Sequence, residues 1–293
     1  MIKKISIIII FFFILKISEY FYFYNKTNGI KNITKIPVFA FHRLVPDDVK
    51  RDIYPDIEWV GSINIFEEMM KYIYQKGFKT INTEELYKWY MGEIEFNKKT
   101  LLITFDDGFY EDYYLVYPII KKYIKIPWIV CLEFSMEMSG EEYNLKATSF
   151  VVGNYIQDKT NPYNKYNKSH IGMDAIDHIR KEYPDFEFQS HSFNMHFFSI
   201  KNRTKRYRIN TMTYKELQID ALKMKRIGFT TMAYPYGNFN KNVKKILKDM
   251  GYLMAFRFWP SQYASRNSDR FAIPRIKLNG DATIDTLKSW LNY

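Results

Sequence analysis

The sequence has a single cysteine, Cys131, among 293 residues. No disulfide can form within the chain, and no zinc site built from several cysteines is possible. The chain lacks an internal repeat of fixed period, which argues against a solenoid or a propeller. Aromatic and basic residues do not alternate regularly, so a nucleic-acid-binding function is disfavoured.

The sequence also lacks a continuous apolar run of about 20 residues, the length that spans a bilayer. A shorter run, Ile5 to Leu15, follows two lysines near the N-terminus. Its length fits the apolar core of a signal sequence, but no small-x-small cleavage site follows it. We expect residues 1–24 to be a signal anchor, with a cleaved signal peptide or a buried hydrophobic segment as alternatives. Residues 25–35 would form a tether, and 36–293 a domain outside the cytoplasm.

Basic residues outnumber acidic ones, with 43 Lys and Arg against 32 Asp and Glu and a net charge of +11. Such an excess favours anionic neighbours such as cell-wall polymers, lipid head groups or nucleic acid, although charge alone does not choose among them. One basic cluster follows residue 200 and either is a solvated surface or steers an anionic polymer. Its members are Lys201, Arg203, Lys205, Arg206 and Arg208.

From residue 36 onward, short apolar runs alternate with segments of helical periodicity, the pattern of an α/β fold with helices outside a parallel sheet or barrel. The expected strands are 36–41, 78–81, 101–105, 129–132, 146–153, 186–189, 231–234, 253–256 and 273–276. The expected helices are 64–76, 84–91, 113–123, 173–181, 214–227, 240–250 and 283–291. Proline and glycine predict a loop over 43–61, and Thr83 is expected to cap the helix that follows it.

Polar side chains follow several of these strands, at the end of the sheet where α/β proteins place their sites. These candidates are His42, Asp106, Asp107, His191, His196, Tyr236 and Arg275. Adjacent carboxylates at a strand end repel each other unless a cation or a proton intervenes. A metal on one carboxylate would leave the other free as a base, and Gly108 allows the sharp turn. The alternative is an ordinary Asp-Gly turn.

His191 and His196 are five residues apart, a spacing that neither a helix nor a strand brings to one face. A loop must bring them together if they share a ligand, and the end of the preceding strand supplies one. Two histidines and one carboxylate are a typical catalytic zinc set with an open position for water. The alternative is a pair of packed or surface histidines. We assign His170 and His178 to structure or solvent.

Four motifs together resemble the polysaccharide deacetylase family, carbohydrate esterase family 4, also called the NodB-homology domain. They are Thr104-Phe105-Asp106-Asp107-Gly108, His191-Ser192 with His196, Tyr234-Pro235-Tyr236-Gly237, and KATSFVVG at 146–153. The resemblance covers roughly residues 36 to 291 and implies a distorted (β/α)7-type barrel. The four residues between the histidines, and the strand that ends at His42, resemble the poly-β-1,6-N-acetylglucosamine deacetylases. In that branch the last family motif is circularly permuted to the N-terminal end.

The resemblance implies a role for each matching residue. Asp107, His191 and His196 would bind a divalent metal, zinc being favoured and cobalt or nickel being alternatives. Asp106 would be the general base and His42 the general acid. The backbone N–H of Tyr236 would stabilise the oxyanion, and Arg275 would pair with Asp106.

The implied activity is hydrolysis of N-acetyl groups on N-acetylglucosamine units of a surface or matrix polysaccharide, with poly-N-acetylglucosamine favoured. A peptidoglycan deacetylase and an inactive glycan-binding surface protein are the alternatives. The implied partners are this polysaccharide and, through the N-terminal segment, a membrane, in an extracytoplasmic location; no nucleic acid is expected. Residues 126–145 depart from the family pattern as an insertion.

Overall fold

The computed structural model describes residues 33–96, 98–125, 128–132, 135–139, 143–201, 203–278 and 280–292. The expected signal anchor, residues 1–24, and most of the expected tether lie outside this range. Within the described residues, no helix combines the length and the apolar character needed to cross a bilayer.

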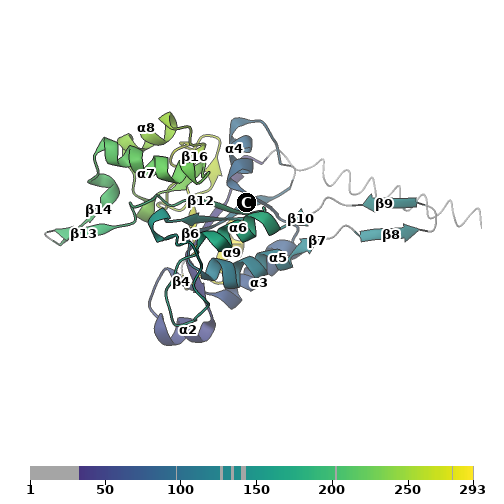
Figure 1. Cartoon of the computed structure of the whole chain (residues 1–293). Helices are drawn as coiled ribbons and strands as arrows, with labels where there is room; N and C mark the ends of the chain where they lie inside the picture. The colour runs from purple at the N-terminus through teal and green to yellow at the C-terminus, as the bar shows by residue number, and fades with distance from the viewer. Residues whose placement is uncertain are drawn as a thin grey trace, which may run out of the picture.

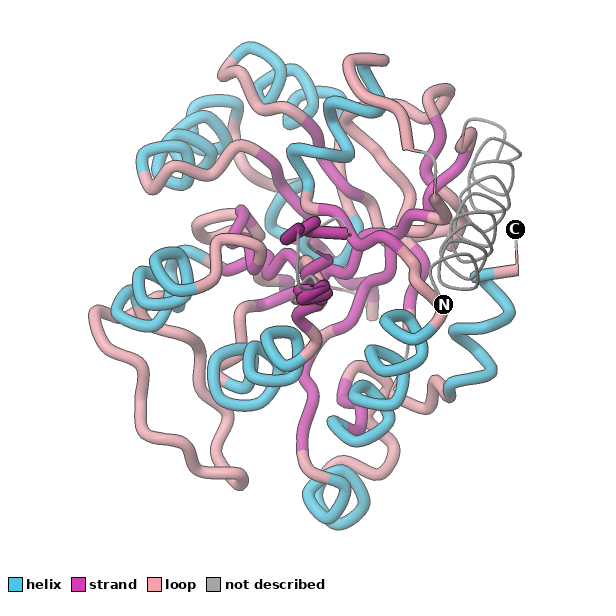
Figure 2. Tube along the Cα trace, turned by 90° about the vertical axis from the view of Figure 1, so that its right-hand side faces the viewer, coloured by secondary structure: helices cyan, strands magenta, loops and turns pink. Residues whose placement is uncertain are grey.

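Eight strands form one parallel sheet, in which β5 pairs with the start of β6 beside the path β16-β15-β12-β11-β6-β2-β18. Their bounds are β2 Val38–Phe41, β5 Lys79–Ile81, β6 Thr100–Asp107, β11 Ala147–Val151, β12 Phe186–Ser190, β15 Thr231–Ala233, β16 Met254–Phe256 and β18 Ile276–Lys277. The sheet curls into a half-barrel with helices around it (Figure 2). The predicted barrel-type α/β fold is confirmed.

The first and last strands of the sheet are neighbours, because β2 lies between β6 and β18. Phe39 pairs with Ile103 on one side and with Ile276 on the other. The last strand is shorter than expected, since Ile273 makes only a single bridge to Phe256 of β16. The segment from 273 to 277 thus contacts both ends of the curled sheet. This arrangement brings the residues after β2 and before β18 to the end of β6.

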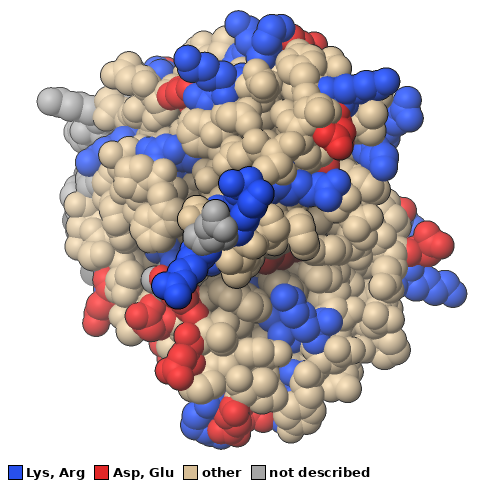
Figure 3. Space-filling view, turned by 90° about the vertical axis from the view of Figure 1, so that its left-hand side faces the viewer, with Lys and Arg blue, Asp and Glu red and all other residues tan. Residues whose placement is uncertain are grey.

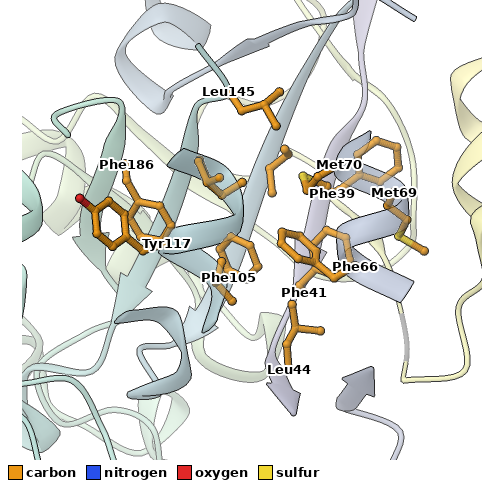
Figure 4. Packing of buried hydrophobic residues seen from close by; sticks show 14 of the residues in the cluster. Phe39, Phe41, Leu44, Phe66, Met69, Met70, Phe105, Tyr117, Leu145 and Phe186 are labelled. Atoms are coloured by element: carbon orange, nitrogen blue, oxygen red, sulfur yellow. The ribbon is translucent and has the colours of Figure 1, made fainter. Parts of the chain in front are cut away.

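The strands are buried on both faces, which is why they read as continuous apolar runs. Alternate side chains of β2 and β6 point to opposite faces. Phe39, Phe41 and Phe105 belong to the larger core cluster, which Figure 4 shows, whereas Val38 and Leu102 belong to a second one. Helices α3 Ile63–Gln75, α5 Tyr117–Lys122, α6 Met173–Glu182 and α9 Ile284–Leu291 contribute to the larger cluster, while α7 Tyr214–Arg226 and α8 Lys241–Asp249 cover a third.

The loop expected over 43–61 is wrong in part. This segment contains β3 Arg43–Val45, α2 Asp47–Ile53 and β4 Val60–Ser62, and β3 pairs with β4. The physical reason is a small separate core in which Val45, Val49 and Val60 are buried together.

Two helix starts also differ from the expectation. Asn82 rather than Thr83 caps α4 Thr83–Met91, because its side chain accepts the Glu85 N–H in a capping box. The helix expected from 113 begins as a π-helix, η1 Asp112–Val116, before α5.

Paired ribbons lie outside the main sheet. The expected insertion, 126–145, holds β8 Trp128–Leu132, β9 Ser135–Ser139 and β10 Tyr143–Asn144; β8 pairs with β9, and β10 pairs with β7 Ile124–Lys125, which lies just before the insertion. A hairpin of β13 Phe198–Lys201 and β14 Thr204–Tyr207 follows the His191 loop and projects from the molecule in Figure 1. Near the first described residues, β1 Lys35–Ile36 pairs with β17 Ala264–Ser265.

Candidate active site

The Asp106-Asp107-Gly108 segment turns sharply at the end of β6. Asp107 and Gly108 both have positive φ, 78° and 69°. A Cβ atom on Gly108 would lie 2.6 Å from Cγ1 of Val151, so the turn needs glycine both for its conformation and for space. The turn directs the two carboxylates to different neighbours, and Asp106 is the more deeply buried of the two.

The loop from His191 to His196 is held by hydrogen bonds at nearly every step. Ser192 has a positive φ of 70°, and its Oγ accepts the Met195 N–H at 3.0 Å. The buried carboxylate of Asp220 on α7 accepts the N–H groups of Phe193 at 2.8 Å and Asn194 at 2.7 Å. These bonds fix the tight loop that the five-residue spacing requires.

Asp107, His191 and His196 meet at one point. Oδ1 of Asp107 lies 2.9 Å from Nε2 of His196 and 3.5 Å from Nε2 of His191. One ligand atom from each residue lies within 4.8 Å of the others. Nδ1 of His191 lies 2.9 Å from the carbonyl oxygen of Ala233, to which it can donate, and this would leave Nε2 with its lone pair toward Asp107.

This triad fits a divalent cation. Asp107 Oδ1 is buried and accepts no well-aligned hydrogen bond from any described residue. Burial lowers the pKa of His191 to about 4, so its imidazole is neutral at pH 7. Burial alone would raise the pKa of Asp107, but the facing imidazoles hold it well below its usual range. One ionised carboxylate with neutral imidazole nitrogens is the donor set of catalytic zinc sites.

Asp106 belongs to a separate cluster on the other side of the turn. Both of its carboxylate oxygens accept hydrogen bonds from Arg275, each at 2.7 Å, and both side chains are buried. Arg275 also donates to Thr104 Oγ1 at 3.2 Å. Burial alone would raise the pKa of Asp106, but the guanidinium of Arg275 keeps it below its ordinary value. Asp106 is therefore ionised.

His42 follows β2 and lies on the same side. Its Nε2 atom is 3.9 Å from Oδ2 of Asp106, and its ring packs edge-on against Phe258 at 5.3 Å between centroids. Burial lowers the pKa of His42 despite the two nearby carboxylates. The imidazole is thus within a short movement of Asp106.

Tyr236 forms the remaining wall of the site. Its φ of 56° is left-handed, an unfavourable conformation for a residue with a side chain. The turn is locked by Gly237, where a Cβ atom would lie 2.6 Å from Cβ of Phe258. The Tyr236 ring stacks on His196 with centroids 4.5 Å apart. Three of the four non-glycine residues with positive φ in the described chain therefore belong to this site: Asp107, Ser192 and Tyr236.

The two clusters open into one cleft of about 580 Å³. Aromatic and basic side chains line it beside the acidic groups: Trp59, Phe258, Trp259, Lys168, Lys205 and Lys277. Figure 3 looks onto the side that carries the β13–β14 hairpin, where Lys and Arg side chains surround a hollow with acidic atoms in its depth. A charged triad at the base of a partly aromatic cleft suits a polar polymer such as a glycan.

Comparisons with known proteins agree with this geometry. Residues 141–255 match the family model described as polysaccharide deacetylase. A poly-β-1,6-N-acetyl-D-glucosamine N-deacetylase of Staphylococcus aureus is 26% identical over 231 residues, which cover 77% of this chain and 70% of the relative. The predicted resemblance to the polysaccharide deacetylase family is confirmed. The predicted enzyme class, a polysaccharide N-deacetylase, is confirmed.

Solved deacetylases share the fold. The Streptococcus pyogenes deacetylase PplD, in complex with acetate, superimposes with a TM-score of 0.69 at 16% identity, covering 90% of this chain and all of PplD (100%). IcaB from Ammonifex degensii gives a TM-score of 0.67 at 17% identity, covering 89% of this chain and 98% of IcaB.

Two features of this deacetylase were missed by sequence reasoning. His170 lines a side pocket with Asp107 and His196, and its ring packs against Tyr155 at 4.5 Å and Phe109 at 5.2 Å. Its assignment to structure or solvent overlooked a place in the wall of the site. The polar loop around it has no periodicity that could have placed it. His178, in contrast, is exposed on α6, as expected.

The second feature is a buried ion pair behind His42. Arg43 Nε donates to Glu111 Oε1 at 2.8 Å, and its other nitrogens contact the Tyr54 hydroxyl and the Asn167 carbonyl. The pair joins β3 to the start of the helix after the Asp-Asp turn and to the His170 loop. Two charged residues 68 positions apart carry no sequence signal of such a contact.

Proposed function

We propose that this deacetylase removes N-acetyl groups from N-acetylglucosamine units of a surface or matrix polysaccharide, poly-N-acetylglucosamine being favoured, and releases acetate. The observation that carries this proposal is the pairing of two clusters at one turn. Asp107 offers a buried, unsatisfied oxygen to two imidazoles, while the adjacent Asp106 stays ionised beside them. The name of the Staphylococcus aureus relative supports the choice of polymer.

Asp107, His191 and His196 would hold the cation, with zinc favoured and cobalt or nickel as alternatives. A divalent cation in this position supplies Lewis-acid chemistry, polarising the acetamide carbonyl and making a water molecule more acidic. The proximity of Asp107 raises the pKa of His196, although burial alone would lower it. Binding of a cation would therefore release a proton from this imidazole.

The other residues would move protons and stabilise charge. Asp106 takes a proton from the water as its oxygen adds to the acetamide carbon, and Arg275 keeps the carboxylate ionised and oriented. The Tyr236 N–H donates to the carbonyl oxygen as negative charge develops there. His42, whose Nε2 lies 3.9 Å from Oδ2 of Asp106, receives that proton and donates it to the nitrogen, the carbon–nitrogen bond breaks, and acetate and a free amine leave.

We propose the same division of the chain as the sequence suggests. Residues 1–24 would anchor the protein or direct its export, 25–35 would be a tether, and 36–293 would be the catalytic domain outside the cytoplasm. The polymer substrate of the Staphylococcus aureus relative supports this location. Each reaction would leave a cationic amine on the polymer, which would promote adhesion to anionic surfaces.

The test is acetate release from β-1,6- and β-1,4-linked N-acetylglucosamine oligomers by purified protein. We expect release from the β-1,6 series, loss with a chelator, and recovery on adding Zn²⁺. Faster release from the β-1,4 series would favour peptidoglycan as the substrate. Binding of oligomers without acetate release at any metal concentration would instead indicate a glycan-binding protein and refute the proposal.

A further inference from the structure

Two lysines face the cleft without a carboxylate partner. Lys168, from the loop after η2 Gly153–Tyr155, and Lys205, from β14, both line it. No described carboxylate forms an ion pair with either ammonium group. In contrast, Lys88 and Lys122 elsewhere on the surface pair with Glu84 at 2.7 Å and Glu67 at 2.6 Å.

Aromatic rings hold both lysines in place. Nζ of Lys168 lies 4.8 Å from the ring centroid of Trp59 and 5.3 Å from that of Phe109. Nζ of Lys205 lies 4.9 Å from the ring centroid of Phe198. Cation–π contacts of this kind favour these positions over a fully solvated side chain. Both positive charges therefore stay beside the cleft.

The other charges that line the cleft are already balanced. Asp106 is paired with Arg275, and Glu58 is paired with Lys277. The divalent cation that the proposed function places on Asp107 would exceed the charge of that carboxylate and add to the positive field of the cleft. The sugars on either side of the reacting unit would thus experience a net positive field from Lys168 and Lys205.

We propose that Lys168 and Lys205 make this cleft selective for an anionic glycan, one that carries a carboxylate or phosphate on a sugar beside the N-acetyl group to be hydrolysed. This inference rests on the proposed deacetylase function and narrows its substrate class to N-acetylglucosamine polymers that carry such acidic substituents. A free amine on the neighbouring sugar, which is the product of an earlier reaction, would be disfavoured for the same reason. Deacetylation would then be dispersed along a polymer instead of continuous.

The experiment compares three N-acetylglucosamine oligomers with an isotopically labelled acetyl group on one sugar. They differ only at the nitrogen of the neighbouring sugar, which carries a succinyl group, an acetyl group or no acyl group. We expect kcat/KM for labelled acetate release to fall in that order, by about threefold per step at low salt, as for unit charges about 8 Å apart in water. High salt should narrow the differences.

Two double variants distinguish an effect of the two lysines in the cleft from an effect of the overall charge of the protein on kcat/KM. In the Lys168→Gln/Lys205→Gln protein the three kcat/KM values should converge. The control Lys215→Gln/Lys241→Gln removes the same charge from exposed positions outside the cleft lining and should keep the wild-type ratios. Binding of the three oligomers to Asp106→Asn protein, in which turnover is greatly slowed, should follow the same order.

Equal kcat/KM values for the three oligomers in wild-type protein, or an order that survives in Lys168→Gln/Lys205→Gln, would overturn the inference while leaving the deacetylase function intact. Absence of labelled acetate from all three would remove the proposed function, and this inference with it.

Discussion

The two clusters at the Asp106–Asp107 turn are built in opposite ways. Around Asp107 the ligand atoms face one another with a buried oxygen left unsatisfied, and strained turns hold them there. Around Asp106 both carboxylate oxygens are engaged by one buried guanidinium. The first cluster is complete only when a cation is added, whereas the second is complete without one.

This difference supports the different tasks that we propose for the two adjacent carboxylates. An unsatisfied buried oxygen costs about 1–3 kcal/mol unless a partner arrives, so Asp107 would be stabilised by the proposed cation. A carboxylate in a two-point ion pair stays ionised and oriented through a reaction cycle. The predictions below test whether cation binding and proton transfer are separable in this way.

The largest expected effect on activity comes from changing the cluster of Asp107, His191 and His196, which we call the cation cluster. His191→Ala should lower acetate release by at least about 10³-fold, because the catalytic metal loses one of three ligands. The same variant should lose the rise in unfolding temperature on adding Zn²⁺ to chelator-treated protein. His178→Ala, at an exposed position on α6, is the matched control and should keep both. If His191→Ala kept the full rise in unfolding temperature with Zn²⁺, His191 would not be a metal ligand, and the contrast between the two clusters would not hold.

The next largest effect on activity is expected from the cluster of Asp106, Arg275 and His42, which we call the proton-transfer cluster. Asp106→Asn should lower kcat by about 10²- to 10⁴-fold, the usual contribution of a general base. Its Zn²⁺-dependent rise in unfolding temperature should remain, because Asp106 is not among the three ligand residues. Unchanged acetate release would refute the role of Asp106. Loss of the zinc response would show that the two clusters are one unit.

A third prediction concerns stability. Arg275→Met should lower the free energy of unfolding by about 3–5 kcal/mol, because it leaves Asp106 buried and unpaired. Adding Asp106→Asn to this variant should recover part of the loss, since the uncompensated charge is removed. Urea unfolding of the two single variants and the double variant measures the coupling. Additive losses would mean that the ion pair is not the source of the effect.

The fold could be predicted well because its signals are local. Apolar runs such as 101–105 and helical patterns such as 214–227 depend only on neighbouring residues, and the observed β6 and α7 match them closely. The prediction of a loop over 43–61 is wrong in part because the strands and the helix there are stabilised by a core of three valines that are not periodic in sequence.

The site could be predicted where residues follow a strand directly. All seven expected site residues lie around the one turn and its walls. Six of them lie at the end of a strand or follow one, and these strands end at the same edge of a parallel sheet, whereas Arg275 lies just before β18. His170 and the Arg43–Glu111 pair could not, since tertiary packing alone brings those loops there. The family model matches only 141–255, so it does not cover Asp106, Asp107 or His42, which are predicted from their positions after strands and from the motifs of the sequence.

The smallest expected effect is on the pH dependence of stability, and it concerns Asp220, which holds the loop that carries the two histidines. Burial raises the pKa of Asp220 from 3.8 to about 6, although it accepts two backbone N–H groups from the His191 loop. The folded state therefore binds more protons than the unfolded state between about pH 4 and 6. This group's contribution to the free energy of unfolding should fall as pH rises through that window, by at most about 3 kcal/mol.

Asp220→Asn removes this titration but also leaves one N–H of the loop without its acceptor, which costs about 1–3 kcal/mol at every pH. The informative quantity is therefore the difference between variant and wild type, measured by urea unfolding of metal-free protein from pH 4 to 7. The variant should be the less stable protein at pH 4, and the difference should shrink toward pH 7. A difference that stays constant would mean that Asp220 does not take up a proton on folding, and that the loop around the two histidines is held by a permanently ionised carboxylate.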